Sequence, residues 1–562
     1  MDTRTQGARL RDELSVPGFV IGIVGCVILT ATSAYTALKL GSLPWPTIFT
    51  SITALLLLRA FGRRSVTEAN VTQIVMSAGS MVAGGLAFTI PGAWMLGLSD
   101  DISWMQMLMV AAAGTLLGLV CTMLIRRRFV DNSDLRYPIG TAAAETLKAT
   151  REGGSTGRKL FASMGAAGTW AVLRDGVHLL PARLFTLDIP GVAFGLNNSP
   201  MWLSMGFLVG IVPVSFWLAS ALFANFGLVV GASSLGLWSV EAAGGIVRSL
   251  GMGLMMGAGL GVVIKDVLYR LVIARLVHGS QDGATPERRD DWAGDIRGRR
   301  DIGMLALLVA AATLVVGVGL GLGPVPTALI VLLSFVTTTM SAQSVGQTGV
   351  DPMEVFGLIV LLCVAAVSDL SQVGLFFVAG VITVTCGLAG DVMADFKTGS
   401  LLGNDPRVLW KAQALGATVG VFVSVATMVA IRTAYGTDAF GLGKEFVSTQ
   451  ASVVATMVTG VPSVPAFAVG LASGIVLYCL GLPAIMMGLG VYLPFYMSVP
   501  AFLGGLVKLV LDRCARRTAR ADDGRTGDAL QEDGMVVASG VLGGESIVGV
   551  IIALVSILAG MG

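Results

Sequence analysis

Long stretches without a charged residue constrain the fold of this chain more than any other feature. Ile302–Val350 contains about fifty such residues and Phe446–Val507 about sixty, whereas a membrane-spanning helix needs only roughly 20. The two stretches therefore predict two and three crossings. Backbone polar groups must be paired inside a bilayer, so we expect the crossings to be helices. The whole chain is predicted to be an all-α polytopic membrane bundle of roughly 14 to 17 segments, including broken or re-entrant helices.

The composition excludes several functional classes. Hydrophobic residues make up 54% of the 562 residues and charged residues 13%, which does not suit a soluble globular protein. The formal net charge of +2 gives no reason to expect a nucleic-acid partner. The six cysteines are scattered without a Cys-x-x-Cys pair, so we predict no protein-bound metal and no cofactor. No ATP-binding motif occurs, so transport would use an ion gradient, the solute gradient or an undetected partner.

Basic residues between the apolar runs predict the orientation of the chain in the membrane, because an excess of lysine and arginine marks the cytoplasmic side. Such clusters precede the first run and follow the second and fourth, at Arg4–Arg11, Arg59–Arg64 and Arg126–Arg128. We therefore predict a multi-pass protein of the cell membrane with a cytoplasmic N-terminus. Residues 1–562 are expected to form a single membrane domain, with cytoplasmic loops at 279–301 and 508–534.

One stretch places polar side chains at the start of an apolar span. On a helix, Glu68, Asn70 and Gln73 bring a carboxylate and two amides to the beginning of the uncharged segment Ile74–Leu98. Ionisable groups beside a span usually face a polar pathway, because charge is unfavourable in lipid. We therefore predict that these three residues contact a solute or hold a gate. The alternative for the acid is a paired structural carboxylate.

Four further residues, in three segments, place an acid or an amide close to apolar stretches. Gln347 and Asp351 lie in the polar, glycine-containing segment Met340–Met353, which predicts a substrate-facing break in a helix, although an ordinary cytoplasmic turn would also fit. Glu145 lies on a short segment with strong helix formers, and Glu545 lies among small residues in the last span. Each acid could instead be a paired structural carboxylate.

Burial favours the protonated form of a carboxyl group, so acids in spans are candidates for binding a coupling proton. We rank the candidates Glu68, Glu145 and Glu545 in that order. Asp391 and Asp395 are also one helical turn apart on one face, which would suit a cation, but the sequence places no third ligand beside them. A polar helix end at the membrane interface explains this pair equally well.

Several segments together resemble the oligopeptide transporter family, which includes the yellow-stripe-like metal-chelate transporters. The matching segments are Glu68–Gln73 with Ser77–Gly79, Tyr137–Glu145, Gly390–Asp391 with Asp395–Gly399, Gly490–Pro494, and Gly543–Ser546. They occur in family order across most of the chain. One segment differs: many relatives have a serine-rich break ending in Asn-Pro, where this chain has Gly346–Pro352 with Asp351.

The resemblance implies a secondary transporter with pseudo-symmetric halves, typically a proton symporter for small peptides or for metal chelates of amino-acid-derived ligands. Its partners would be such a solute, protons and the lipid bilayer. The glycine-rich spans permit helix contacts within one chain or between copies, so a homo-oligomer stays open. A passive channel or a structural membrane protein is the alternative. An intramembrane enzyme is not expected, because His178 and His278 are the only histidines and neither lies in a metal motif.

Overall fold

The structure is a computed structural model in which the chain forms two compact units. It describes residues 13–41, 47–133, 135, 137, 139–141, 143, 144, 147, 156–262, 264, 265, 296, 298–348, 351–521 and 525–560. The first unit comprises Met1–Gly154, Val267–Phe440 and Gln450–Val458. The second unit comprises Ser155–Asp266, Gly441–Thr449 and Thr459–Gly562.

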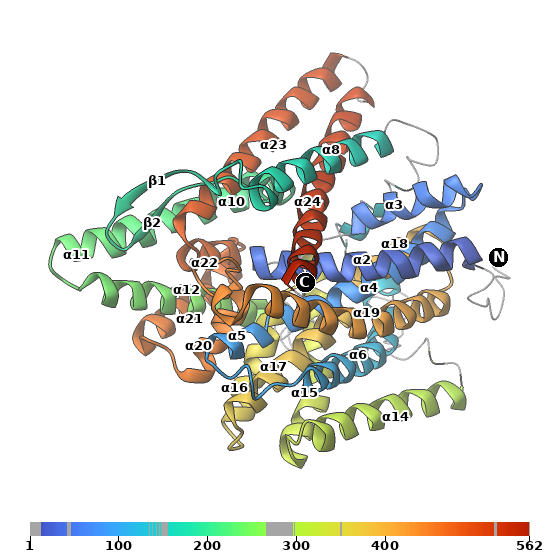
Figure 1. Ribbon diagram of the computed structural model, residues 1–562. Helices are drawn as coiled ribbons and strands as arrows, with labels where there is room; N and C mark the ends of the chain where they lie inside the picture. The colour runs from blue at the N-terminus through green and yellow to red at the C-terminus, as the bar shows by residue number, and fades with distance from the viewer. Residues whose placement is uncertain are drawn as a thin grey trace, which may run out of the picture. The chain divides into compact units, whose positions relative to one another are not determined.

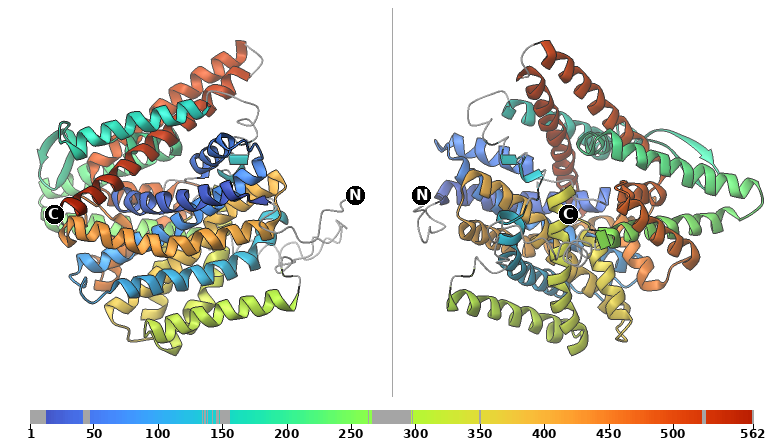
Figure 2. Two further views of the ribbon diagram at one scale, coloured as in Figure 1. Left: turned by 45° about the vertical axis from the view of Figure 1, so that its right-hand side comes forward. Right: turned by 180° about the vertical axis from the view of Figure 1, so that it is seen from behind.

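The first unit is a bundle in which the long helices α2, α4, α19 and α6 run side by side (Figures 1 and 2). Its helices are α2 (Val16–Leu40), α3 (Thr47–Ala60), α4 (Val66–Ala87), α5 (Ile90–Met95), α6 (Trp104–Arg126), α14 (Arg299–Leu314), α15 (Pro324–Thr348), α16 (Met353–Ala365), α17 (Gln372–Cys386), α18 (Val392–Leu402), α19 (Pro406–Tyr435) and α20 (Thr449–Thr459). Short π-helical turns extend three of these helices, at Arg127–Asp131, Val315–Gly319 and Gly387–Asp391, and a 3₁₀ turn covers Thr437–Ala439.

The second unit combines helices with one short β-hairpin. Its elements are α8 (Thr156–Ala171), a π-helical turn (Val172–Gly176), β1 (Arg183–Ile189), β2 (Val192–Asn197), α9 (Pro200–Val209), α10 (Ile211–Leu222), a π-helical segment (Phe223–Gly231), α11 (Ala232–Ser234), α12 (Val240–Val262), α21 (Val464–Cys479), α22 (Ala484–Tyr492), α23 (Phe495–Ala521) and α24 (Arg525–Gly560). The antiparallel hairpin pairs Ile189 with Val192 across a Pro190-Gly191 turn, in which Gly191 has a φ of 76°. This hairpin was not predicted from the sequence, although Pro-Gly between apolar runs is a turn signal.

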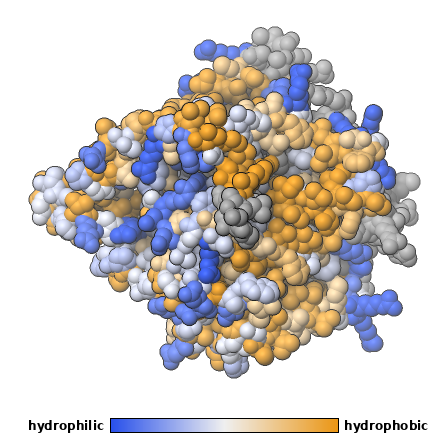
Figure 3. Space-filling model, viewed as in Figure 1, coloured by the Kyte–Doolittle hydropathy of each residue, from blue (hydrophilic) through white to orange (hydrophobic). Residues whose placement is uncertain are grey.

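The prediction of a polytopic helical membrane bundle is confirmed. Of the described residues, ten helices are long and apolar enough to cross a membrane, and four shorter apolar helices accompany them. Large hydrophobic side chains remain exposed along α2, at Val16, Phe19, Val20, Val24, Val27 and Ile28. Figure 3 shows a broad hydrophobic area over α2 and α19. An exposed apolar surface of this kind suits contact with lipid tails. The pseudo-symmetry of the halves stays a prediction.

Proline, glycine and polar residues accompany the helix breaks of the first unit. Pro91 lies in the first turn of α5, separated from α4 by a short interruption. Gly321 and Gly323, with φ values of 68° and 79°, end the alternating glycine tract between α14 and α15. The polar break before Asp351 is shorter than predicted, because α15 continues to Thr348 and α16 begins at Met353.

The predicted loop at 508–534 is helical in the structure. Helix α23 continues to Ala521 and α24 begins at Arg525, so the described parts of this segment are helix. Arginine, alanine and leucine, which are frequent here, have high helix propensity, and charge alone does not prevent a helix. The prediction of a loop was wrong for the described part of this segment, and its cytoplasmic placement stays a prediction. Most of the other predicted loop, 279–301, lies outside the described residues, and Arg299–Asp301 form the first turn of α14.

Glycines allow α12 and α21 of the second unit to pack closely. A Cβ atom added to Gly257 would lie 2.1 Å from the carbonyl oxygen of Leu471, and one added to Gly470 would lie 2.3 Å from that of Leu250. Both distances are far below a van der Waals contact. Small residues permit this backbone approach, which supplies dispersion attraction between helices in lipid.

Gly257→Leu is expected to separate α12 from α21. Overpacking a core destabilises a protein by roughly 1–3 kcal/mol, and the effect here should be at least that large because the added side chain clashes with backbone atoms. The melting temperature of the purified protein measures this effect. Gly244→Leu on the same helix is the control, since nothing lies within 4 Å of a Cβ atom placed there. Equal melting temperatures for the two variants would contradict the packing described here.

Candidate functional site

Helix α4 lies at the centre of the first unit. It packs against α2, α3, α17, α18 and α19, and each of its residues from Glu68 to Ala87 is buried. The hydroxyl of Ser65 caps the helix by accepting from the backbone N–H of Glu68 at 3.2 Å. The helix therefore begins just before its polar residues and holds their side chains on a fixed frame. These polar side chains face protein groups inside the unit and not lipid.

Gln73 and Ser77, one turn apart on α4, bind the carboxylate of Asp395 on α18. Gln73 Nε2 donates to Asp395 Oδ1 at 3.1 Å, and Ser77 Oγ donates to Asp395 Oδ2 at 2.8 Å. Gln73 Nε2 also lies 3.2 Å from Ser77 Oγ. Asp395 is only 3% exposed and Gln73 is fully buried. Two donors held one turn apart thus fix both oxygens of a buried carboxylate.

Asn70 belongs to a second polar group near the start of α4, the end that is predicted to lie towards the cytoplasm. Its Nδ2 donates to Asn404 Oδ1 at 3.2 Å. Asn404 Nδ2 in turn donates to Glu13 Oε2 at 2.7 Å and to the carbonyl oxygen of Thr67 at 3.1 Å. Asn404 was not predicted as a site residue, because nothing in the sequence spacing shows that the turn before α19 reaches α4.

Glu68 lies in the first turn of α4, where its carboxylate meets the start of α2. The backbone N–H of Ser15 donates to Glu68 Oε1 at 3.2 Å, and the side chain is 6% exposed. A Cβ atom added to Gly18 would lie 3.2 Å from the same oxygen, so the glycine leaves room for the carboxylate. Among the described residues, no basic side chain pairs with Glu68.

The segment that joins α17 to α18 is a π-helical turn, Gly387–Asp391. Two buried side chains of neighbouring helices donate to the carbonyl oxygen of Leu388, Thr122 at 3.0 Å and Gln413 at 2.6 Å. Turns of this kind are frequent at functional sites, because they redirect side chains and free backbone carbonyls. Here the turn carries Asp391, and Asp395 follows in the first turn of α18.

Asp351 lies beside this π-helical turn. Ser341 Oγ donates to Asp351 Oδ1 at 2.6 Å. A Cβ atom added to Gly390 would lie 3.0 Å from Asp351 Oδ2 and 1.6 Å from Ser341 Oγ. The sequence showed no third carboxylate near Asp391 and Asp395, whereas the structure brings Asp351 close to Asp391. A contact between residues forty positions apart has no signal in a single sequence, although the glycine before Asp391 is compatible with it.

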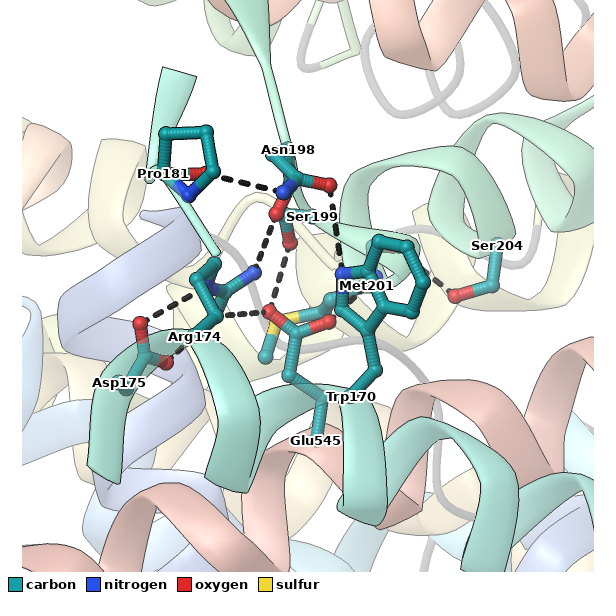
Figure 4. Close-up of polar contacts among 9 residues, drawn as sticks. All are labelled: Trp170, Arg174, Asp175, Pro181, Asn198, Ser199, Met201, Ser204 and Glu545. Carbon is teal, nitrogen blue, oxygen red and sulfur yellow. Dashed lines mark hydrogen bonds and ion pairs between the residues drawn. The ribbon is translucent and has the colours of Figure 1, made fainter. Parts of the chain in front are cut away.

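Glu545 belongs to a separate polar cluster in the second unit (Figure 4). Its Oε1 accepts from Arg174 NH2 and from Ser199 Oγ, each at 2.7 Å, and its Oε2 accepts from the backbone N–H of Met201 at 2.8 Å. The guanidinium of Arg174 also binds Asp175 and the carbonyl oxygen of Asn198. The arrangement matches the structural alternative considered for Glu545, while its part in proton binding stays a prediction.

Two predicted site residues cannot be placed. Glu145 lies outside the described residues, and Gln347 lies in the last turn of α15 but its side chain is not among those described. Of the other predicted residues in the first unit, Gln73 meets Asp395, Asn70 meets Asn404, Glu68 meets Ser15, and Asp351 meets Ser341.

Among the amides of α4 and the acids Asp351 and Asp391, four buried oxygens accept no hydrogen bond from any described residue. They are Asn70 Oδ1, Gln73 Oε1, Asp351 Oδ2 and Asp391 Oδ1. A buried acceptor without a donor is unfavourable by about 1–3 kcal/mol, so such groups usually serve a bound water, ion, proton or ligand. All four would accept from the N–H or ammonium groups of a peptide-like solute. The group of Gln73, Ser77, Asp351, Asp391 and Asp395, together with Asn70 one turn before Gln73 on α4, is called the acidic site below.

Comparison with known proteins gives a consistent result. The family model described as OPT oligopeptide transporter protein matches residues 13–556, nearly the whole chain. The chain is also 26% identical to a Haemophilus influenzae protein named "Putative oligopeptide transporter", over 93% of this chain and 92% of that protein. The match covers both compact units and every described residue of the acidic site. The chain belongs to the OPT oligopeptide transporter family.

Proposed function

We propose that this protein is a secondary active transporter of the cell membrane that moves small peptides, or metal chelates of peptide-derived ligands, together with protons. It alternates between inward-open and outward-open states around the acidic site. The relative from Haemophilus influenzae is named for oligopeptides, which supports a peptide as the solute. The N-terminus is cytoplasmic in this proposal, as the distribution of basic residues predicts.

The unpaired amide oxygens on α4 are the observation that carries this proposal. Asn70 and Gln73 are fully buried, and their Oδ1 and Oε1 atoms have no donor among the described residues. Such groups would be replaced by apolar side chains if α4 served packing alone. The amide oxygens match the N–H groups of a peptide, and the carboxylate of Asp395 matches its amino group. Peptide binding would therefore complete the hydrogen bonds that the protein leaves open.

A solute screen tests this function. Purified protein in proteoliposomes is assayed for counterflow of di- and tripeptides and of iron and nickel chelates, with and without a pH gradient. We expect counterflow of peptides, and accumulation against a concentration gradient only when the pH gradient is present. If the pH gradient changed the flux of none of the solutes, the result would favour a passive channel and contradict proton coupling.

Glu68 is the first candidate for the coupling proton, ahead of Glu145 and Glu545. Glu68→Gln keeps the size of the side chain and its acceptor oxygen for Ser15 but removes the titratable group. Gradient-driven uptake is expected to fall towards the level without a gradient, while counterflow persists because it moves no net proton. Glu241→Gln, at an exposed position in α12, is the control. Undiminished driven uptake in Glu68→Gln would remove this residue from the coupling mechanism.

A further inference from the structure

Asp391 is a buried acid whose hydrogen bonding is incomplete. The residue is 5% exposed, and its Oδ1 has no donor among the described residues. It lies at the end of the π-helical turn, inside the helical segment Gln372–Leu402, whose most apolar part is almost wholly buried. No described basic residue pairs with it. Burying an ionised carboxylate without a partner is very unfavourable, so this position calls for a compensating ligand.

Asp351 repeats these properties from the other side of the same turn. It is 7% exposed, Ser341 occupies its Oδ1, and its Oδ2 has no donor among the residues that the structure describes. Gly390 allows this carboxylate to pack against the π-helical turn directly before Asp391, and the charges of Asp351 and Asp391 repel each other. Each carboxylate therefore has one oxygen that lacks a hydrogen-bond donor among the described residues. Each also has a second carboxylate of like charge beside it.

The surroundings supply further negative charge and no described compensating cation. Asp395 on α18 and Glu354 in the first turn of α16 both act electrostatically on Asp391. The thiol that neighbours the pair is that of Cys386 on α17, and the thiol of Cys121 on α6 lies near Cys386. The segment α15 contributes Ser341 and has no ionisable residue in its sequence.

Two basic residues on helices of the same unit are engaged with other groups. Arg126 of α6 pairs with Asp131 at 2.5 Å, and Lys397 of α18 donates to the carbonyl oxygen of Val130 at 3.3 Å. The acid on α4, Glu68, lies more than one turn before Gln73 and contacts Ser15. Of the described residues, no group of three or more His, Cys, Asp or Glu side chains is arranged to hold a metal ion.

We propose that Asp351 and Asp391 together bind one exchangeable proton, and that this pair is a second proton-coupling position of the transporter besides Glu68. Two adjacent buried carboxyl groups without a cation cannot both ionise readily, so one of them retains a proton. That proton converts one carboxylate into a donor and lowers the charge of the cluster by one. It enters from water on one side of the membrane and leaves to water on the other, so charge balances over a cycle. Proton binding by the pair does not depend on the proposed function, whereas its role in coupling rests on that function.

Proton binding by the pair can be measured without transport. Infrared difference spectra of the purified protein between acidic and alkaline pH report the C=O stretch of a protonated carboxyl group. We expect such a band in the wild type, its loss or shift in Asp391→Asn and in Asp351→Asn, and its persistence in Asp438→Asn, which alters an exposed aspartate of the same unit. A spectrum that is identical in the wild type and both Asn variants would overturn the proposal.

Transport measurements then test the coupling role. Asp391→Asn is expected to reduce pH-driven peptide accumulation to the level without a gradient, with counterflow still measurable. If driven accumulation in both Asn variants equals that of the wild type, the pair is not a coupling position, although the proposed function stands. If the wild type moves no peptide while the infrared band behaves as expected, the proposed function fails and the proton site remains. If Asp391→Asn does not fold, Asp391→Glu replaces it in the test. Asp391→Glu keeps a carboxyl group and should retain the infrared band, and loss of the band in this variant would also contradict the proposal.

Discussion

Gln73→Met is expected to weaken peptide counterflow by about 10- to 100-fold, the largest functional effect of any single substitution in α4. Methionine preserves the length of the side chain but removes the donor to Asp395 Oδ1 and the open acceptor Oε1. A hydrogen bond to a charged group contributes about 1.5–3 kcal/mol, which corresponds to this range in affinity. The measurement is the concentration dependence of counterflow in proteoliposomes.

Gln372→Met is the matched control for this substitution, because Gln372 is an exposed glutamine in the first turn of α17. Its counterflow should equal that of the wild type. Melting temperatures of both variants separate loss of binding from loss of folding. If Gln73→Met transported peptides with unchanged affinity, the amides of α4 would not contact the solute, and the proposed site would be wrong.

Glu545→Ala is expected to destabilise the second unit by about 3–5 kcal/mol, because it leaves a buried cation with less compensation. Arg174 is 5% exposed and would keep Asp175, but it would lose the carboxylate that joins it to Ser199 and to the start of α9 (Figure 4). The backbone N–H of Met201 would also lose its acceptor. The melting temperature and the yield of folded protein are the measurements.

Two comparisons sharpen this prediction. Asp533→Asn breaks the ion pair between Asp533 and Lys159. The side chain of Lys159 is 36% exposed and that of Asp533 is 34% exposed, so this substitution should change stability by only about 0–1 kcal/mol. The double variant Arg174→Met with Glu545→Leu should recover part of the loss, because an apolar pair needs no charge compensation. A Glu545→Ala protein as stable as the wild type would show that the ion pair is dispensable.

The sequence predicted the membrane bundle well, because segment length and apolar composition directly determine what can cross a bilayer. It also located the polar start of α4, where Ser65 caps the helix and Glu68 follows three residues later. Helix breaks at Pro91 and Gly321 were predictable from backbone chemistry alone. The hairpin at Arg183–Asn197 was not predicted, since its second strand, Val192–Asn197, lies in a long uncharged region that the length rule assigns to helices.

The candidate site was predictable only in part. Single residues such as Gln73 and Asp391 stand out because polar groups are rare in apolar segments. Their partners do not, since the contacts of Gln73 with Asp395 and of Asn70 with Asn404 span more than three hundred residues of sequence. Asp351 was predicted as a break residue, but its place beside Gly390 depends on tertiary packing. Pairings of this kind require coordinates or many related sequences.

Solvent access to Ser77 is the most direct test of the claim that α4 borders the solute route. Ser77→Cys would be made with the exposed Cys363, Cys479 and Cys514 replaced by serine, and treated in membranes with a water-soluble maleimide. Ala78→Cys, the next residue of the same helix, is the control and should stay unlabelled. The account predicts that Ser77→Cys is labelled and that a transported peptide slows the reaction. Failure of the reagent to reach Ser77→Cys from either side of the membrane, under either direction of the pH gradient, would contradict the account.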